Sequence, residues 1–186
     1  TEGEAIAEIA HQCGALLIVG ADPASLGVMV PPARYGCDLV CGDIQPLGIH
    51  MHYGGGLGGF IGCRDEERFV MEYPFRLFGI ARTSVPGEWG FGDVAYDRTS
   101  FAQREEGREF VGTAAALWAI TAGVYLSLMG PKGMRELGTT IMQKSQYAMA
   151  RLSDIPGVKA PAFDAPHFKE FVVDFSGTGR TVRQIN

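Results

Sequence analysis

The stretch DLVCGDIQPLGIHMHYGGGLGGFIG, residues 38–62, decides the fold of this chain. Its apolar run Leu39-Val40-Cys41 predicts a buried strand, and Phe60-Ile61 predicts a second one. A polar turn at Gln45-Pro46 and a glycine-rich bend lie between the two strands. Open α/β sheets bind their ligands in loops at the carboxyl ends of such strands. The stretch therefore predicts a strand that leads into a loop suited to carry a functional site.

The flanking sequence extends this pattern. Helical periodicity and continuous apolar runs alternate along the chain, which is typical of an α/β protein with a mainly parallel sheet and flanking helices. Helices are predicted at 1–13, 65–71, 113–128 and 131–152, and strands at 15–19, 38–41 and 58–63. Residues 77–80 and 90–92 read as short strands or as an extended excursion, and 171–175 alternates like an antiparallel strand. We expect a large domain over 1–155 and the start of a small α+β domain over 156–186.

Composition excludes several classes of protein. The chain has 186 residues, a formal net charge of −5 and 20% charged residues. Its basic residues form no stripe that would follow a phosphate backbone, so no nucleic-acid partner is expected. The longest apolar run, 113–129, is interrupted by polar residues and shorter than a bilayer span, so no membrane partner is expected. Four cysteines without a CxxC pair predict buried thiols in a reducing compartment, and hence a cytoplasmic protein.

Two groups of residues are candidates for a site. His50 and His52 lie on one face of an extended segment, which fits a metal site, the wall of a cleft or subunit contact, or plain surface. Glycines 54–56 do not fit a dinucleotide fingerprint because they lead into a strand, so they indicate close approach of the backbone to a neighbour. Arg104 and Arg108 belong to a charge run that forms either a solvated surface or the rim of a cleft for a carboxylate or phosphate.

Several stretches, taken together, resemble the glycine dehydrogenase (decarboxylating) family, the P-protein of the glycine cleavage system. The similarity covers residues 5–155 and follows the pattern of the alpha subunit, subunit 1 of the split form. The stretches are HQCGALLIVGADPASLGVM (11–29), PPARYGCDLVCGDIQPLG (31–48), YGGGLGGFIGCR (53–64), RLFGIARTSVPGEWGF (76–91) and AITAGVYLSLMGPKGMRELG (119–138).

The resemblance implies part of the large domain of fold-type I pyridoxal-phosphate (PLP) enzymes. The family decarboxylates glycine and passes the aminomethyl group to a lipoyl carrier protein, with PLP held as a Schiff base by a lysine. That lysine position corresponds to Pro46, and the position of the aspartate that pairs with the pyridinium nitrogen corresponds to Gly20. Neither residue can take the role. The resemblance therefore implies no catalytic residue and no PLP in this chain, with the cofactor bound by a beta-subunit partner.

The same comparison assigns the remaining candidates to the wall of a partner's site or to a subunit contact: His50, His52, Tyr53, Gly54, Gly55, Gly56, Arg104 and Arg108. One segment departs from the family pattern, which reads REKATSNICTNQAL where this chain has REEGREFVGTAAAL at 104–117. Because of this departure, the resemblance does not establish which substrate or partner this segment contacts. Relatives have more sequence on both sides, so the chain resembles a fragment, and an exposed sheet edge predicts homo- or hetero-oligomers.

Two other functions fit the residues. One is an independent PLP enzyme that uses another lysine, although Lys132, Lys144, Lys159 and Lys169 all lie away from the glycine-rich bend in the sequence. The other is a divergent, non-catalytic chain of the same fold that serves as a scaffold or binding module, which the departure at 104–110 would explain.

Overall fold

The structure is a computed structural model that describes residues 2–51, 57–73, 77–93, 97, 99–108 and 115–186. The chain divides into two compact units. The first comprises residues 1–21 and 31–122, and the second comprises 22–30 and 123–186. These two units reflect compactness and do not test the predicted domain boundary at residue 155, which stays a prediction.

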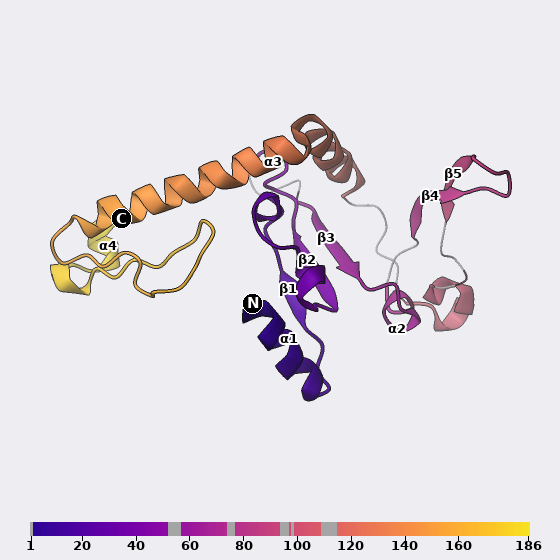
Figure 1. The fold of residues 1–186 in the computed structure, drawn as a ribbon, viewed down its shortest axis with the longest axis horizontal. Helices are drawn as coiled ribbons and strands as arrows, with labels where there is room; N and C mark the ends of the chain where they lie inside the picture. The colour runs from indigo at the N-terminus through magenta and orange to yellow at the C-terminus, as the bar shows by residue number, and fades with distance from the viewer. Residues whose placement is uncertain (1, 52–56, 74–76, 94–96, 98, 109–114) are drawn as a thin grey trace. The chain divides into compact units, whose positions relative to one another are not determined.

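A three-stranded sheet in the order β1-β2-β3 organises the first unit (Figure 1). Its strands are β1 (Ile18–Gly20), β2 (Leu39–Asp43) and β3 (Gly59–Cys63), close to the predicted positions. β1 runs parallel to β2 with Ile18 opposite Leu39, and the α/β prediction is confirmed. β3 runs antiparallel to β2, so this sheet is mixed. No helix occurs in the described part of the β2–β3 connection, and a parallel return normally needs such a crossover.

The apolar strand β1 is less covered than its sequence predicts. A continuous apolar run is typical of a strand buried on both faces. Ile18, however, is 60% exposed, and Leu16 just before the strand is 48% exposed. β1 pairs with β2 along one edge. Within the described ranges, no element covers the side chains of Leu16 and Ile18 as fully as the sequence predicts.

Gly42 explains how the parallel strands come close together. The Ala21 N–H donates to the Cys41 carbonyl at 2.9 Å, so the chain leaving β1 lies against β2 at this point. A Cβ on residue 42 would collide with the Ala21 carbonyl oxygen and would lie 2.6 Å from Cε1 of Phe60. Only glycine fits here without movement of the backbone.

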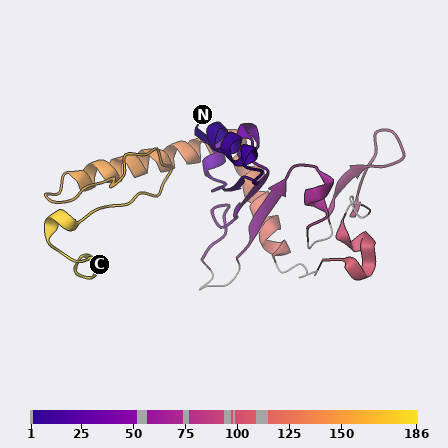
Figure 2. The same ribbon diagram turned by 90° about the horizontal axis from the view of Figure 1, so that it is seen from below.

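The rest of the first unit consists of short elements. Helix α1 (Glu2–Gln12) precedes the sheet, the short 3-10 helix η2 (Pro32–Tyr35) leads to β2, and helix α2 (Glu67–Val70) follows β3. Strands β4 (Phe78–Arg82) and β5 (Trp89–Asp93) form an antiparallel hairpin, which confirms the strand alternative for this region (Figure 2). The 3-10 helix η4 (Ser100–Glu106) then leads toward the long helix α3 (Ala116–Ser153), which continues into the second unit.

Helix α3 and the segment after it make up most of the second unit. Gly130, at φ 59° and ψ −178°, interrupts α3 immediately before Pro131, so the two predicted helices meet at this kink. The 3-10 helix η1 (Ser25–Gly27) packs closely against α3 at Met134. The predicted strand at 171–175 is reduced to an isolated antiparallel bridge between Lys159 and Asp174. The chain ends with η5 (Ser176–Thr178) and α4 (Val182–Ile185), whose first turn carries a Thr181–Gln184 capping box.

Candidate functional site

The loop after β2 is a compact turn tied by the side chain of Gln45. The Gln45 amide nitrogen donates to the carbonyls of Ile49 and His50, both at 2.8 Å, and the backbone N–H of Gln45 donates to Asp43 Oδ1 at 3.1 Å. Ile49 is buried, while Pro46 is half-buried within the turn. The turn thus places residue 46 where the sequence predicts it, directly beyond the carboxyl end of β2.

Replacing Gln45 by alanine should destabilise the chain by about 1–2 kcal/mol, because two carbonyls of the turn lose their donor. Urea unfolding followed by circular dichroism measures the effect. Gln12→Ala is the matched control, since the Gln12 amide makes one exposed hydrogen bond to Glu8 at 3.2 Å. A loss for Gln45→Ala no larger than that for Gln12→Ala would show that the side chain does not hold the turn.

Of the other site residues predicted in this loop, only His50 lies within the described part of the chain. His50 is exposed, and its carbonyl accepts the Gln45 amide described above. His52, Tyr53, Gly54, Gly55 and Gly56 lie outside the described residues. Across the described ranges, no group of three or more His, Cys, Asp or Glu side chains is arranged to hold a metal ion. The assignment of His50, His52, Tyr53 and glycines 54–56 to a cleft wall or subunit contact stays a prediction.

Arg104 and Arg108 both lie on the surface. The Arg108 side chain pairs with Glu72 at 2.7 Å, and the two side chains are 54% and 62% exposed. Its backbone N–H donates to the hydroxyl of buried Ser100 at 2.9 Å. Arg104 is exposed at φ 53°, a left-handed conformation that is uncommon for arginine and that kinks η4. The assignment of the two arginines to the rim of a cleft or to a solvated charged surface stays a prediction.

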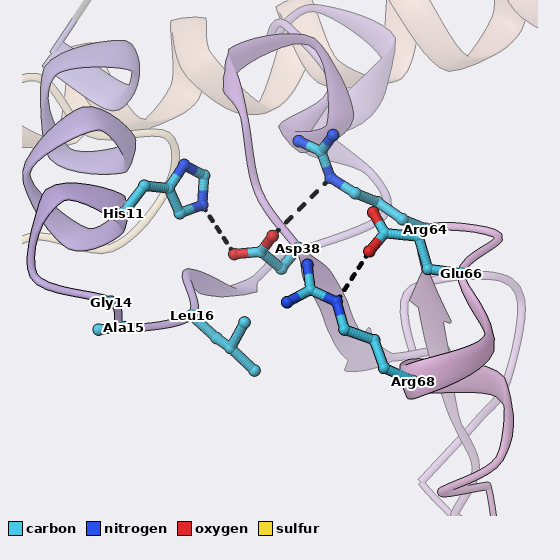
Figure 3. Close-up of a pocket in the computed structure, with 8 residues that line it drawn as sticks. All are labelled: His11, Gly14, Ala15, Leu16, Asp38, Arg64, Glu66 and Arg68. Carbon is cyan, nitrogen blue, oxygen red and sulfur yellow. Dashed lines mark hydrogen bonds and ion pairs between the residues drawn. The ribbon is translucent and has the colours of Figure 1, made fainter.

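A cluster of charged residues that the sequence did not single out surrounds Asp38. The Asp38 side chain is 5% exposed, and its Oδ2 accepts the Leu17 N–H at 2.8 Å and contacts His11 Nε2 at 2.9 Å (Figure 3). Arg64 Nε lies 3.8 Å from Oδ1. Sheet register explains this convergence, because Leu39 faces Ile18 on one side and Cys63 on the other. The residues next to them, Leu17 and Arg64, therefore flank Asp38.

These contacts keep Asp38 ionised. The Leu17 N–H and the His11 hydrogen bond lower the pKa of the Asp38 carboxyl, against the opposing effect of burial. Burial raises the pKa of the neighbouring Cys37 thiol, which makes this cysteine a poor nucleophile. Cys37 is buried and Cys13 is exposed, so the prediction of buried thiols holds for only part of the set. The side chains around Asp38 can therefore bind a ligand and compensate its charge, and the neighbouring Cys37 is not an activated nucleophile.

The sequence carried a weak signal for this cluster. An acidic residue directly before a strand, together with a histidine in the last turn of a preceding helix, is compatible with an ion pair. Nothing local predicts that the two meet, since 27 positions separate His11 from Asp38.

Comparison with known proteins identifies several that are similar to this chain. It is 38% identical over 173 residues to a probable glycine dehydrogenase (decarboxylating) subunit 1 of Aeropyrum pernix, covering 93% of this chain and 36% of the relative. The corresponding protein of Staphylothermus marinus is 37% identical, with 97% and 38% covered. A crystal structure of glycine decarboxylase, the P-protein of the glycine cleavage system, in inhibitor-bound form matches with a TM-score of 0.76 and 35% identity, covering 89% of this chain and 37% of the other.

The sheet, its flanking helices and the turn after β2 define an α/β chain that corresponds to part of a PLP-transferase large domain. The model of the glycine cleavage system P-protein family matches residues 1–185. The chain belongs to this family, and the resemblance seen in the sequence is confirmed. It spans only 36% and 38% of the length of the two relatives named above. No helix among the described residues is both long and apolar enough to cross a membrane.

Proposed function

We propose that this chain belongs to a glycine dehydrogenase (decarboxylating) subunit that does not anchor PLP itself. It supports glycine decarboxylation and transfer of the aminomethyl group to a lipoyl carrier protein, while a beta-subunit partner carries the cofactor. Family membership and the names of the relatives as subunit 1 support the glycine cleavage role. The observation that carries the non-anchoring part is Pro46, which stands in the turn after β2 and has no amine.

The residues of the first unit do not fit PLP as a covalently bound group. Lys132, Lys144, Lys159 and Lys169 are the only lysines, and all four belong to the second unit. Lys169 is also paired there with Asp22. The side chain of Gln45 cannot substitute, because its nitrogen belongs to a carboxamide and is not a nucleophilic amine. The unit with the sheet therefore offers no lysine for a Schiff base.

Borohydride reduction tests the assignment of the cofactor. The chain and a beta subunit, co-expressed and purified as a pair, are reduced in the presence of PLP and mapped by peptide mass spectrometry. We expect the pyridoxyl label on a lysine of the beta subunit and none on this chain. A stoichiometric label on any of the four lysines of this chain would overturn the proposal and favour an independent PLP enzyme.

Carrier-dependent exchange of CO₂ with the glycine carboxyl distinguishes the proposed function from the remaining alternative, a non-catalytic scaffold. The pair should exchange at a rate that neither chain reaches alone. The departure from the family pattern at 104–110 favours the scaffold function, which predicts a stable pair without exchange. Size-exclusion chromatography with light scattering confirms that the pair has formed before activity is compared.

A further inference from the structure

A pocket of about 420 Å³ lies beside the Asp38 cluster (Figure 3). The end of α1, the segment entering β1, the start of β2 and the residues after β3 form its walls, all within the first unit. It lies at the end of the parallel strands opposite to the Gln45 turn, because Asp38 precedes β2 and Gln45 follows it. The pocket is therefore separate from the position that the family resemblance assigns to the cofactor.

Both carboxylates of the pocket already have partners. Asp38 accepts the Leu17 N–H and contacts His11, as described above. Glu66 Oε2 accepts Arg68 Nε at 2.8 Å. A cation entering the pocket would have to compete with these contacts, so the carboxylates do not favour a cationic ligand.

The two arginines, in contrast, retain unused donors. Arg64 uses Nε, which donates to the Cys37 carbonyl at 3.3 Å and lies 3.8 Å from Asp38 Oδ1. Arg68 uses Nε for Glu66, and its guanidinium lies 4.4 Å from the ring centre of Phe69. The terminal nitrogens of neither guanidinium bond to any described residue, and the side chains are 46% and 62% exposed. Both guanidinium groups of the pocket thus keep cationic, fork-shaped donors that no described residue uses.

We propose that this pocket binds a small anion through the terminal guanidinium nitrogens of Arg64 and Arg68. Guanidinium groups recognise carboxylate and phosphate through paired N–H donors, so the ligand carries one of these groups. The guanidinium of Arg64, whose Nε lies 3.8 Å from Oδ1, offsets part of the negative charge of Asp38 and so reduces its repulsion of the anion. The volume is that of a site for a small metabolite.

Titration with inorganic phosphate and, separately, with acetate tests this site and distinguishes the two anions. Chloride keeps the ionic strength constant, and backbone amide shifts of the ¹⁵N-labelled protein report binding. The main variant is Arg68→Gln, since among the described residues Arg68 forms an ion pair with Glu66 and none with Asp38. Arg64→Lys keeps the charge beside Asp38 and removes the fork. Arg151→Gln is the control, because this exposed arginine pairs with Asp154 in the other unit.

We expect saturable binding of at least one anion, with shifts at residues 14–17, 38 and 64–68. Arg68→Gln should weaken it by about tenfold or more, since hydrogen bonds to charged groups contribute strongly, and Arg64→Lys should weaken it by less. Arg151→Gln should bind like the parent protein. The proposal is overturned if neither anion saturates these shifts, or if Arg68→Gln and Arg151→Gln bind equally well. Both outcomes are independent of PLP and of the beta subunit.

Discussion

The Gly42→Ala variant is expected to be destabilised by about 3 kcal/mol, which corresponds to a fall in Tm of roughly 6–12 °C for a chain of this size. The added methyl group would collide with the Ala21 carbonyl oxygen and lie 2.6 Å from the Phe60 ring. The carbonyl belongs to the backbone and cannot rotate away. β1 and β2 must therefore separate, which also disturbs the turn that begins two residues after Gly42.

Gly20→Ala is the matched control for this prediction. Gly20 ends β1 opposite Cys41, and a Cβ at this position would meet no atom within 4 Å. Alanine there should be neutral or should stabilise the chain slightly, because it reduces the freedom of the unfolded chain. Thermal and urea unfolding measure both variants. Equal effects of the two substitutions would mean that close packing of Gly42 against Ala21 does not stabilise the sheet.

Replacing Asp38 by alanine should cost about 3 kcal/mol of unfolding free energy. The change leaves the Leu17 N–H without its acceptor and leaves His11 and Arg64 without their shared carboxylate. Asp38→Asn keeps an oxygen for Leu17 and should lose about half as much. The control is Asp154→Ala, which breaks an ion pair whose two side chains are 65% and 67% exposed and should cost less than about 0.5 kcal/mol.

The dependence of this loss on pH follows from the lowered pKa of Asp38. A carboxylate with a depressed pKa in the folded state stabilises the fold above its unfolded pKa, near 3.9, and loses that effect as the pH falls toward the folded value. The difference in stability between the parent protein and Asp38→Asn should therefore be full at pH 7 and should shrink below about pH 4. Asp174, whose pKa the Ser176 N–H also lowers, is present in both proteins and cancels. A difference that is constant from pH 7 to pH 3 would contradict the ionic role of Asp38.

Local sequence was sufficient for most, but not all, elements of the fold. Apolar runs bounded by glycine placed β2 and β3 close to their observed bounds, and Gly130-Pro131 located the kink in α3. These signals work because they depend on residues close together in the chain. The strand predicted at 171–175 is only a bridge to Lys159, since pairing depends on a partner segment as well as on alternation.

The sequence by itself determined that the chain is α/β and that it belongs to the P-protein family. The family resemblance also implies that Pro46 stands where a lysine would be needed, which stays a prediction. Each of these depends on residue identity or on short-range pattern. Only the tertiary structure decided that β3 returns antiparallel and that Asp38 is buried among residues far away in the chain. The register of three strands sets those contacts, placing Leu17 and Arg64 on either side of Asp38. For that reason the turn at Gln45-Pro46 was visible in the sequence, whereas the pocket at the opposite end of the same strand was not.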